Sequence, residues 1–284
     1  MVRLAGLAGR RGLLVAGLAA LFLGAAGLWL ATSWRSPSEV SSPPSPAKPV
    51  RTAPEPAPSL LLPGLLAALT STTPAYVSPG GPKAPAIAPT WHGSKLVLPV
   101  IAVYHGELEV RLPTRPDGST AWIPRAAVHL YRSSYRIVVN LSTRHLLLYR
   151  DGKLVLDAPA GVGTSVDPTP TGDFFVALFA PAPGPAWGPF VIVTSAHSKA
   201  ISNWEDSGDA MIAIHGPLGA SAEIGTTGAR VSHGCVRLHD SALAQLRDVP
   251  DGSPIDIIAG TASHPSPLLA RARRQLAAAS ETSS

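Results

Sequence analysis

Short apolar runs separated by turn residues occupy most of the sequence between residues 73 and 258. The runs are rich in Val, Ile, Leu, Tyr and Phe, and they end at Gly, Pro or Asp-Gly, as in LVLPVIAVY, YRIVVNL, HLLLYRDG and DFFVALFA. Runs of this length bounded by turn residues are typical of β-strands. The dipeptides Asp117-Gly118 and Asp151-Gly152 predict tight hairpin turns. We therefore expect a mainly β fold.

The predicted strands fall into two groups, residues 73–131 and residues 134–260. The first group predicts a small module similar to bacterial SH3-type β-barrels, whose role would be wall binding or structural packing alone. The second group predicts a larger sheet-rich domain with one short helix over residues 241–247, for which Asp240 is the expected N-cap. A last strand is expected over residues 255–258.

The N-terminal part of the chain has a different character. Residues 12–31 form an uncharged apolar stretch that follows three arginines. Twenty residues in a helix span about 30 Å, which is the thickness of a hydrocarbon core. The positive flank favours an N-terminus in the cytoplasm and the remaining chain outside it. We predict a signal or membrane anchor over residues 1–35, with a cleaved signal peptide as the alternative to an uncleaved anchor.

Residues 36–72 are dominated by Pro, Ala and Ser, which predicts a semi-rigid extended linker. The short run at residues 60–69 inside it could form a helical turn or no structure at all. Residues 261–284 predict a loosely attached, arginine-rich tail. The net charge of +5 is spread along the chain and is not interleaved with aromatic residues, so the sequence does not favour nucleic-acid binding.

Cys235 is the only cysteine, so the chain cannot form an internal disulfide. It lies two residues after His233 and two before Arg237. If this segment is extended, the three side chains share one face. An imidazole beside a thiol lowers the pKa of the thiol and can act as its base. Arg237 would favour the thiolate or bind a substrate carboxylate.

Two glycines complete the pattern. Gly234 would let the main chain approach a substrate, so that the N–H groups of Gly234 and Cys235 could face a developing oxyanion. His215 and Gly216 stand at the end of another predicted strand, and His215 would be a second histidine of the site or a packing residue. A nucleophile, a base, a charge and an oxyanion hole together predict an acyl-transfer site.

A zinc site is the chemical alternative. The candidate ligands are His215, His233, Cys235 and His239. The chain lacks a CxxC pair and an HExxH motif, and no carboxylate beside the cluster is an obvious base. We therefore expect no metal and no cofactor.

The residues around Cys235 also carry a family resemblance. His215-Gly216, with sixteen residues between His215 and Ser232, followed by Ser232-His233-Gly234-Cys235, closely resembles the signature of L,D-transpeptidase catalytic domains. The stretch Pro-Thr-Pro-Thr-Gly-Asp-Phe at residues 168–174 is similar to another family segment, and YRIVVNLSTRHLLLYRDG is similar to the first hairpin of these domains. The resemblance covers about residues 134–258.

The resemblance implies a β-sandwich catalytic domain in which Cys235 is the nucleophile and His233 the base. A backbone carbonyl, that of Ser232, is implied to orient the histidine ring. The implied substrate-binding and oxyanion residues are His215, Gly216, Ser232, Gly234 and Arg237. Residues 187–209 are expected to form the loop that covers the site.

The implied substrates are peptidoglycan stem peptides, usually with meso-diaminopimelate at the third position, and the implied inhibitors are carbapenem-type β-lactams. A thioester on Cys235 would be resolved by a neighbouring stem amine, which makes a cross-link in the cell envelope outside the cytoplasm. Water as the acceptor would give an L,D-carboxypeptidase, and a protein amine is a further option. A non-catalytic wall-binding protein is the alternative from another class.

Overall fold

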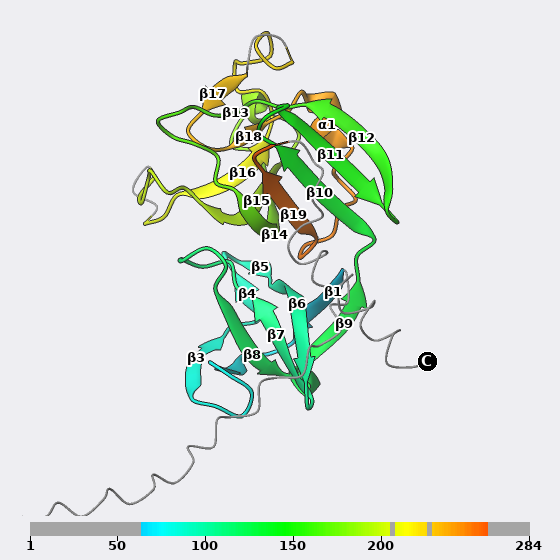
Figure 1. The fold of residues 1–284 in the computed structure, drawn as a ribbon, viewed down its shortest axis with the longest axis vertical. Coiled ribbons are helices and arrows are strands. Elements are labelled where there is room, and N and C mark those ends of the chain that lie inside the picture. Colours follow the sequence, from blue (N-terminus) through cyan, green and yellow to red (C-terminus); the bar gives the residue numbers. More distant parts are fainter. Residues whose placement is uncertain (1–63, 205–207, 226–228, 261–284) are drawn as a thin grey trace, which may run out of the picture. The chain divides into compact units, whose positions relative to one another are not determined.

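A computed structural model gives the fold of residues 64–204, 208–225 and 229–260 (Figure 1). The predicted anchor, most of the predicted linker and the predicted tail lie outside these described residues. Within the described ranges, no helix has the length and apolar character needed to cross a membrane.

A small β module comes first, built on a seven-stranded sheet with the order β3-β2-β8-β7-β6-β1-β9. Its elements are β1 (Leu65–Leu69), β2 (Thr73–Tyr76), β3 (Lys83–Ile87), β4 (Thr90–Trp91), β5 (Ser94–Lys95), β6 (Val97–Tyr104), β7 (Glu107–Arg111), β8 (Thr120–Pro124), the 3-10 turn Arg125–Ala127 and β9 (Val128–Arg132). The predicted hairpin around Asp117-Gly118 is confirmed, because β7 pairs antiparallel with β8. Its turn is longer than the predicted tight turn, since the Leu112 N–H donates to the Ser119 carbonyl and residues 113–118 form the loop.

Strand β1 corrects the predicted domain boundary. Its five residues are buried and pair on one side with β6 and on the other with β9, although they fall inside the predicted linker 36–72. An uncharged run of Leu and Ala that is buried throughout has no alternation, so its periodicity does not separate a strand from a helical turn. The ordered module therefore begins before residue 73.

The second part of the chain holds an eight-stranded sheet with the order β12-β11-β10-β19-β14-β15-β16-β18, beside the two-stranded pair β13-β17. Its elements are β10 (Tyr135–Asn140), β11 (His145–Arg150), β12 (Lys153–Pro159), β13 (Val162–Gly163), β14 (Gly172–Ala180), the 3-10 turn Pro185–Trp187, β15 (Val191–His197), β16 (Met211–His215), β17 (Arg230–Ser232), β18 (Val236–Arg237), α1 (Asp240–Ala244) and β19 (Pro254–Ile258). The mainly β prediction is confirmed.

The predicted hairpin strands β10, β11 and β12 form as expected, with antiparallel pairing from each to the next. The predicted helix is present as α1, the only α-helix in the described ranges. Its N-cap is His239, without a side-chain capping bond, and Asp240 is its first residue. The expected cap was therefore wrong by one position, and the acid instead acts on the helix dipole from the first turn.

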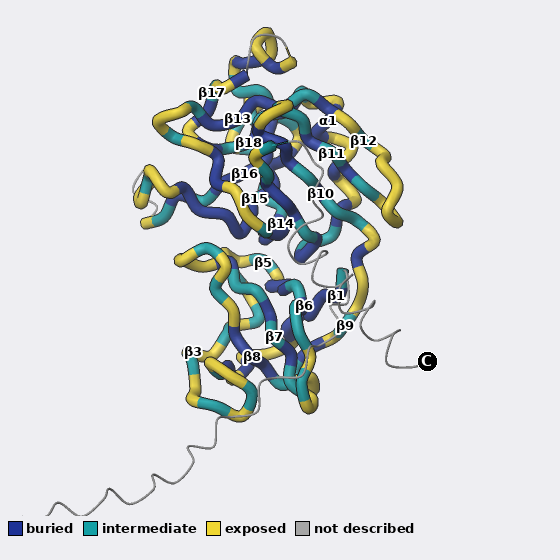
Figure 2. The backbone as a smooth tube through the Cα atoms, viewed as in Figure 1, coloured by how far each residue is buried: buried dark blue, intermediate teal, exposed yellow. Residues whose placement is uncertain are grey.

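Strand β14 contributes to two hydrophobic cores. Phe174 and Val176 lie in the core of the eight-stranded sheet, while Phe175 and Ala177 lie in the cluster formed by the module. Successive side chains of a strand point to opposite faces, so one strand can serve both cores. Figure 2 shows that most residues of β14, β15 and β16 are buried; β15 and β16 lead to the candidate site.

Candidate active site

Cys235 lies at the start of β18, beside the end of β16. The two strands are parallel, with Ile214 opposite Val236 and His215 opposite Arg237. The Cys235 sulfur is half-buried and accepts a hydrogen bond from the Ala213 N–H at 3.4 Å. The pairing of β16 with β18 therefore joins the two motif segments, with His215 opposite Arg237 and the Cys235 sulfur beside Ala213.

The main chain bends sharply just before the cysteine. Strand β17 ends at Ser232, β18 begins at Val236, and Gly234 has a φ of 117°. The continuous extended segment assumed for residues 233–237 is therefore absent. A Cβ atom on Gly234 would lie 2.7 Å from Cδ1 of Ile212, so both the backbone angle and the space require glycine.

Hydrogen bonds fix this bend from both sides. The Gly234 N–H donates to Ser232 Oγ at 3.1 Å, and Ser232 Oγ donates to the Cys235 carbonyl at 2.6 Å. Thr169, from the Pro-Thr-Pro-Thr-Gly stretch, donates its hydroxyl to the Gly234 carbonyl at 2.7 Å. The Gly234 N–H, expected to face an oxyanion, is thus occupied by Ser232 in this structure.

His233 is exposed and makes two contacts that the sequence did not predict. Its Nδ1 donates to Asp167 Oδ2 at 2.5 Å, and the Trp204 ring lies against it with the centroids 5.3 Å apart. The family resemblance implied that the Ser232 carbonyl orients the ring, whereas that carbonyl accepts the Thr164 N–H at 3.0 Å. Asp167 and His233 are 66 residues apart, so only the fold brings them together.

His215 is buried under the site. Its Nδ1 donates to the Gly216 carbonyl at 2.8 Å, and the Trp187 ring packs against it at a centroid distance of 4.5 Å. Burial, together with the charge of Arg237, lowers the pKa of His215 to about 4 despite the Gly216 contact. A histidine held neutral in this way suits a packing or positioning role better than that of a base.

Gly216 has no room for a side chain. Its N–H donates to the Trp187 carbonyl at 2.7 Å, and an added Cβ would lie 2.5 Å from the Gly188 nitrogen. The motif glycine therefore allows residues 187–188 to approach the end of β16. The expectation that residues 187–209 form one loop over the site is wrong for Val191–His197, which form strand β15 inside the sheet. Beyond Gly188, the segment after β15 contacts the site through Trp204, whose ring lies against His233.

The electrostatics at Cys235 differ from the sequence expectation. Burial raises the pKa of the Cys235 thiol, and the Ala213 N–H and the Arg237 charge offset that rise only in part. Burial also lowers the pKa of Arg237. The expected thiol of lowered pKa is thus absent from this arrangement, because the ring of His233 is hydrogen-bonded to Asp167 and not to the sulfur.

The other expectation about this region concerns metal. Among the described residues, no group of three or more His, Cys, Asp or Glu side chains could hold a metal ion, so the geometry does not support the zinc alternative. A cavity of about 650 Å³ is lined by Arg111, Asp173, His197 and Lys199, among others. Cys235 is not part of its lining.

Comparison with known proteins finds a family similarity in the part of the chain that carries Cys235. Residues 134–257 match the family model of the L,D-transpeptidase catalytic domain. Two curated relatives named L,D-transpeptidase YkuD match the same part of the chain. The protein from Bacillus licheniformis is 32% identical over 124 residues, which are 43% of this chain and 65% of that protein. The protein from Bacillus subtilis is 26% identical over 128 residues, which are 45% and 68%. The chain thus spans slightly less than two thirds of the first relative.

Solved structures with similarity to the chain include an L,D-transpeptidase from Mycobacterium smegmatis, at 18% identity and a TM-score of 0.33, covering 54% of this chain and 90% of that one. Bd1075 from Bdellovibrio bacteriovorus is 22% identical with a TM-score of 0.37, covering 52% and 56%. These scores are low, and the assignment rests on the sequence match over residues 134–257. That segment is similar to the L,D-transpeptidase catalytic domain family.

Proposed function

We propose that this protein is an L,D-transpeptidase that forms a thioester on Cys235 and cross-links diaminopimelate-containing stem peptides of peptidoglycan. The observation that carries the proposal is the position of Cys235 within the family-matched segment, two residues after His233 and next to β18, which pairs with the strand that ends in His215. The protein would work outside the cytoplasm in the cell envelope, held at the membrane by its N-terminal segment.

The first half of the proposed reaction forms the acyl-enzyme. The Cys235 sulfur attacks the carbonyl carbon after the third stem residue, and its proton passes to His233. The resulting tetrahedral oxyanion collapses, the bond to the terminal D-Ala breaks, and His233 returns the proton to the leaving amine. A thioester and free D-Ala result.

The second half regenerates the enzyme. A side-chain amine of a neighbouring stem attacks the thioester carbonyl, and the Cys235 thiolate leaves. The proton lost by the amine returns to the sulfur through His233, so that each proton taken up is released within one turnover. The product is a cross-link between the third residues of two stems.

The raised pKa of the Cys235 thiol decides how the base would act. Because the thiolate is disfavoured, we expect the thiol to lose its proton to His233 at the moment when the sulfur attacks the substrate. A stable thiolate–imidazolium pair before the attack is not expected. The donation of Nδ1 to Asp167 leaves the lone pair on Nε2, the ring nitrogen that would accept the proton. The charge of Arg237 favours the thiolate as it forms.

The remaining motif residues would hold the site in shape. Ser232 and Gly234 fix the bend that presents the sulfur, and His215 with Gly216 forms the floor under it. The oxyanion would be stabilised by main-chain N–H groups, once the Gly234 N–H exchanges its bond to Ser232 for one to substrate.

Mass spectrometry of isolated cell wall tests the proposal. The wall is incubated with the wild-type protein or with Cys235→Ala, and the released muropeptides are compared. New cross-links between third-position residues, with loss of D-Ala only for wild type, support transpeptidation. Loss of D-Ala without cross-links would indicate an L,D-carboxypeptidase. No change, together with wall binding that survives in Cys235→Ala, would indicate a non-catalytic binding protein.

A carbapenem provides a second test of the nucleophile. The family assignment leads us to expect one covalent adduct on wild type and none on Cys235→Ala. An adduct on the alanine variant would contradict the assignment of Cys235.

A further inference from the structure

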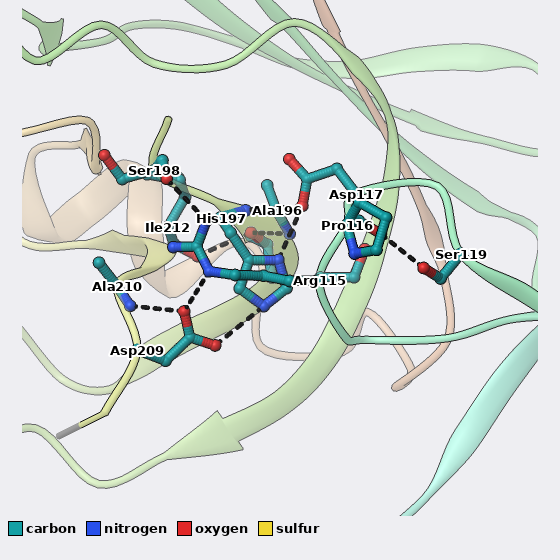
Figure 3. A network of polar contacts seen from close by, with 12 residues as sticks. Arg115, Pro116, Asp117, Ser119, Ala196, His197, Ser198, Asp209, Ala210 and Ile212 are labelled. Carbon is teal, nitrogen blue, oxygen red and sulfur yellow. Dashed lines mark hydrogen bonds and ion pairs between the residues drawn. The ribbon is translucent and has the colours of Figure 1, made fainter. Parts of the chain in front are cut away.

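The turn between β7 and β8 of the module reaches the domain that carries Cys235. Asp117, in this turn, accepts the His197 N–H at 3.0 Å and lies 2.7 Å from the Nδ1 atom of the same residue (Figure 3). His197 is the last residue of β15, and its side chain is buried. Its Nε2 lies 3.2 Å from Asp209 Oδ2, within ion-pair distance but without hydrogen-bond alignment.

Arg115, from the same turn, forms hydrogen bonds through its guanidinium group with the segment that follows β15. Its Nε donates to Asp209 Oδ1 at 2.8 Å, and its two terminal nitrogens donate to the carbonyls of Ser198 at 3.0 Å and Ile201 at 3.1 Å. These contacts join residues up to 94 positions apart in the chain. A planar guanidinium can make several such bonds at once, which a lysine ammonium cannot do in the same geometry.

Asp209 is tied to both sides of this contact. Burial would raise the pKa of Asp209, but hydrogen bonds from Arg115 and the Ala210 N–H, together with nearby positive charge, lower it. The carboxylate is therefore held in its charged form. Its own main-chain carbonyl accepts the Trp204 N–H at 2.8 Å. Trp204 is in turn the residue whose ring lies against His233.

A continuous series of contacts thus leads from the module to the candidate base. Arg115 binds the Asp209 carboxylate, the Asp209 carbonyl binds the Trp204 N–H, and the Trp204 ring meets the His233 ring. We propose that Arg115 is a positioning residue for the reaction: from the N-terminal module it sets the place of Trp204, and thereby the orientation of His233. The expected effect of Arg115 on the reaction rate rests on the proposed function, whereas its expected effect on the orientation of the His233 ring does not.

Partial exposure makes the Arg115 contact a weak source of global stability. The side chains of Arg115 and Asp209 are 39% and 32% exposed, and ion pairs of this kind contribute little to the free energy of unfolding. Arg115→Ala should therefore keep a melting temperature near that of wild type, so that a change at the site can be separated from loss of the fold.

The test uses the full chain, NMR of ¹⁵N-labelled histidine side chains, and a carbapenem. Arg115→Ala should move the His233 imidazole resonances toward their positions in Trp204→Ala. In the variant that carries both substitutions, these resonances should lie at the same positions as in Trp204→Ala alone. Acylation of Cys235 should slow by about 2- to 30-fold in Arg115→Ala, the range of coupling through side-chain contacts. Arg125→Ala is the matched control, because the Arg125 guanidinium donates to Val128 within the module.

The outcomes separate this inference from the proposed function. Unchanged His233 resonances in Arg115→Ala, or effects of Arg115→Ala and Trp204→Ala that simply add, would overturn the positioning role even if acylation slows. A wild-type protein that no carbapenem acylates would refute the proposed function, while the resonances would still decide the inference. If Arg115→Ala unfolds, Arg115→Lys replaces it, and the same resonance shift is expected.

Discussion

The Nδ1 atom of His233 lies 2.5 Å from a carboxylate oxygen of Asp167. A carboxylate in this place accepts the Nδ1 proton and so fixes which nitrogen of the neutral ring is free. It also stabilises the imidazolium that forms when the ring takes up a second proton. The pair therefore has direct consequences for how a base at this position works.

Replacing Asp167 with Asn should slow acylation of Cys235 by about 10-fold or more, because an amide holds the ring less firmly and does not stabilise its charged form. The rate is measured with a carbapenem by stopped-flow fluorescence or mass spectrometry. Asp151→Asn, at the exposed turn after β11, is the matched control and should react at the wild-type rate. Equal rates for wild type and Asp167→Asn would remove Asp167 from the mechanism.

The two histidines should behave differently when removed. His233→Ala should slow acylation by at least about 10²-fold, the lower end for losing a general base. His215→Ala should change the rate less, since His215 is buried and neutral. Both histidine variants must first retain the melting temperature of wild type. A larger loss of rate in His215→Ala than in His233→Ala would exchange their roles.

Alkylation of wild-type Cys235 by iodoacetamide should show a pH midpoint above that of a free thiol, because burial raises the pKa of the Cys235 thiol.

The pKa of His215 predicts a pH dependence of stability. Its folded-state pKa of about 4 lies below its ordinary value of 6.5, so the unfolded chain binds the proton more readily. The contribution of His215 to stability is complete above pH 6.5 and is lost as the pH falls toward 4, by roughly 3 kcal/mol in total. Urea unfolding at pH 7 and pH 4 measures the loss. His215→Asn, which keeps a donor near the Gly216 carbonyl, should lose less over the same interval. An identical loss in both proteins would contradict this assignment.

Gly234→Ala should abolish acylation and destabilise the fold by roughly 1–3 kcal/mol, since the new Cβ would meet Ile212 in a backbone conformation that L residues rarely adopt. Gly152→Ala is the matched control: its φ is also positive, at 74°, but no atom lies within 4 Å of the added Cβ. Chemical denaturation of both variants separates steric contact from backbone strain. A control as unstable as Gly234→Ala would show that strain alone accounts for the effect.

Truncation at two positions tests the corrected module boundary. A chain that begins at residue 64 keeps β1 and should fold, whereas a chain that begins at residue 73 should not. The loss of the buried Leu66 and Leu69 side chains alone removes roughly 3–6 kcal/mol, comparable with the stability of a whole domain. Circular dichroism and thermal melting measure both proteins. Cooperative melting of the shorter chain at the temperature of the longer one would restore the original boundary.

Local sequence patterns predicted the parts of this fold that depend on neighbouring residues. The hairpins at Asp117-Gly118 and Asp151-Gly152 follow from turn chemistry, and the site around Cys235 from residue types within a few positions. Strand β1 was not predicted, because its burial depends on β6 and β9, which lie later in the chain. Asp167, Trp204 and Arg115 escaped prediction for the same reason.

The direction of the Cys235 pKa shift shows a different kind of limit. The spacing of His233 and Cys235 placed an imidazole near a thiol, but the shift depends on burial and on where the ring points. Gly234 turns the main chain between them, and Asp167 competes for the ring. Motif spacing thus predicts candidate reactive residues but does not determine the electrostatics around them.

The alternating side chains of β14 have a consequence for how this protein could have been assembled. Phe175 and Ala177 belong to the core of the preceding module, while Phe174 and Val176 belong to the core of the sheet that contains β14. A gene fusion that joined an unrelated module upstream would leave a phenylalanine facing water, and the catalytic segment expressed alone would be prone to self-association. The two halves are therefore constrained to change together at the positions where the side chains of β14 enter both cores.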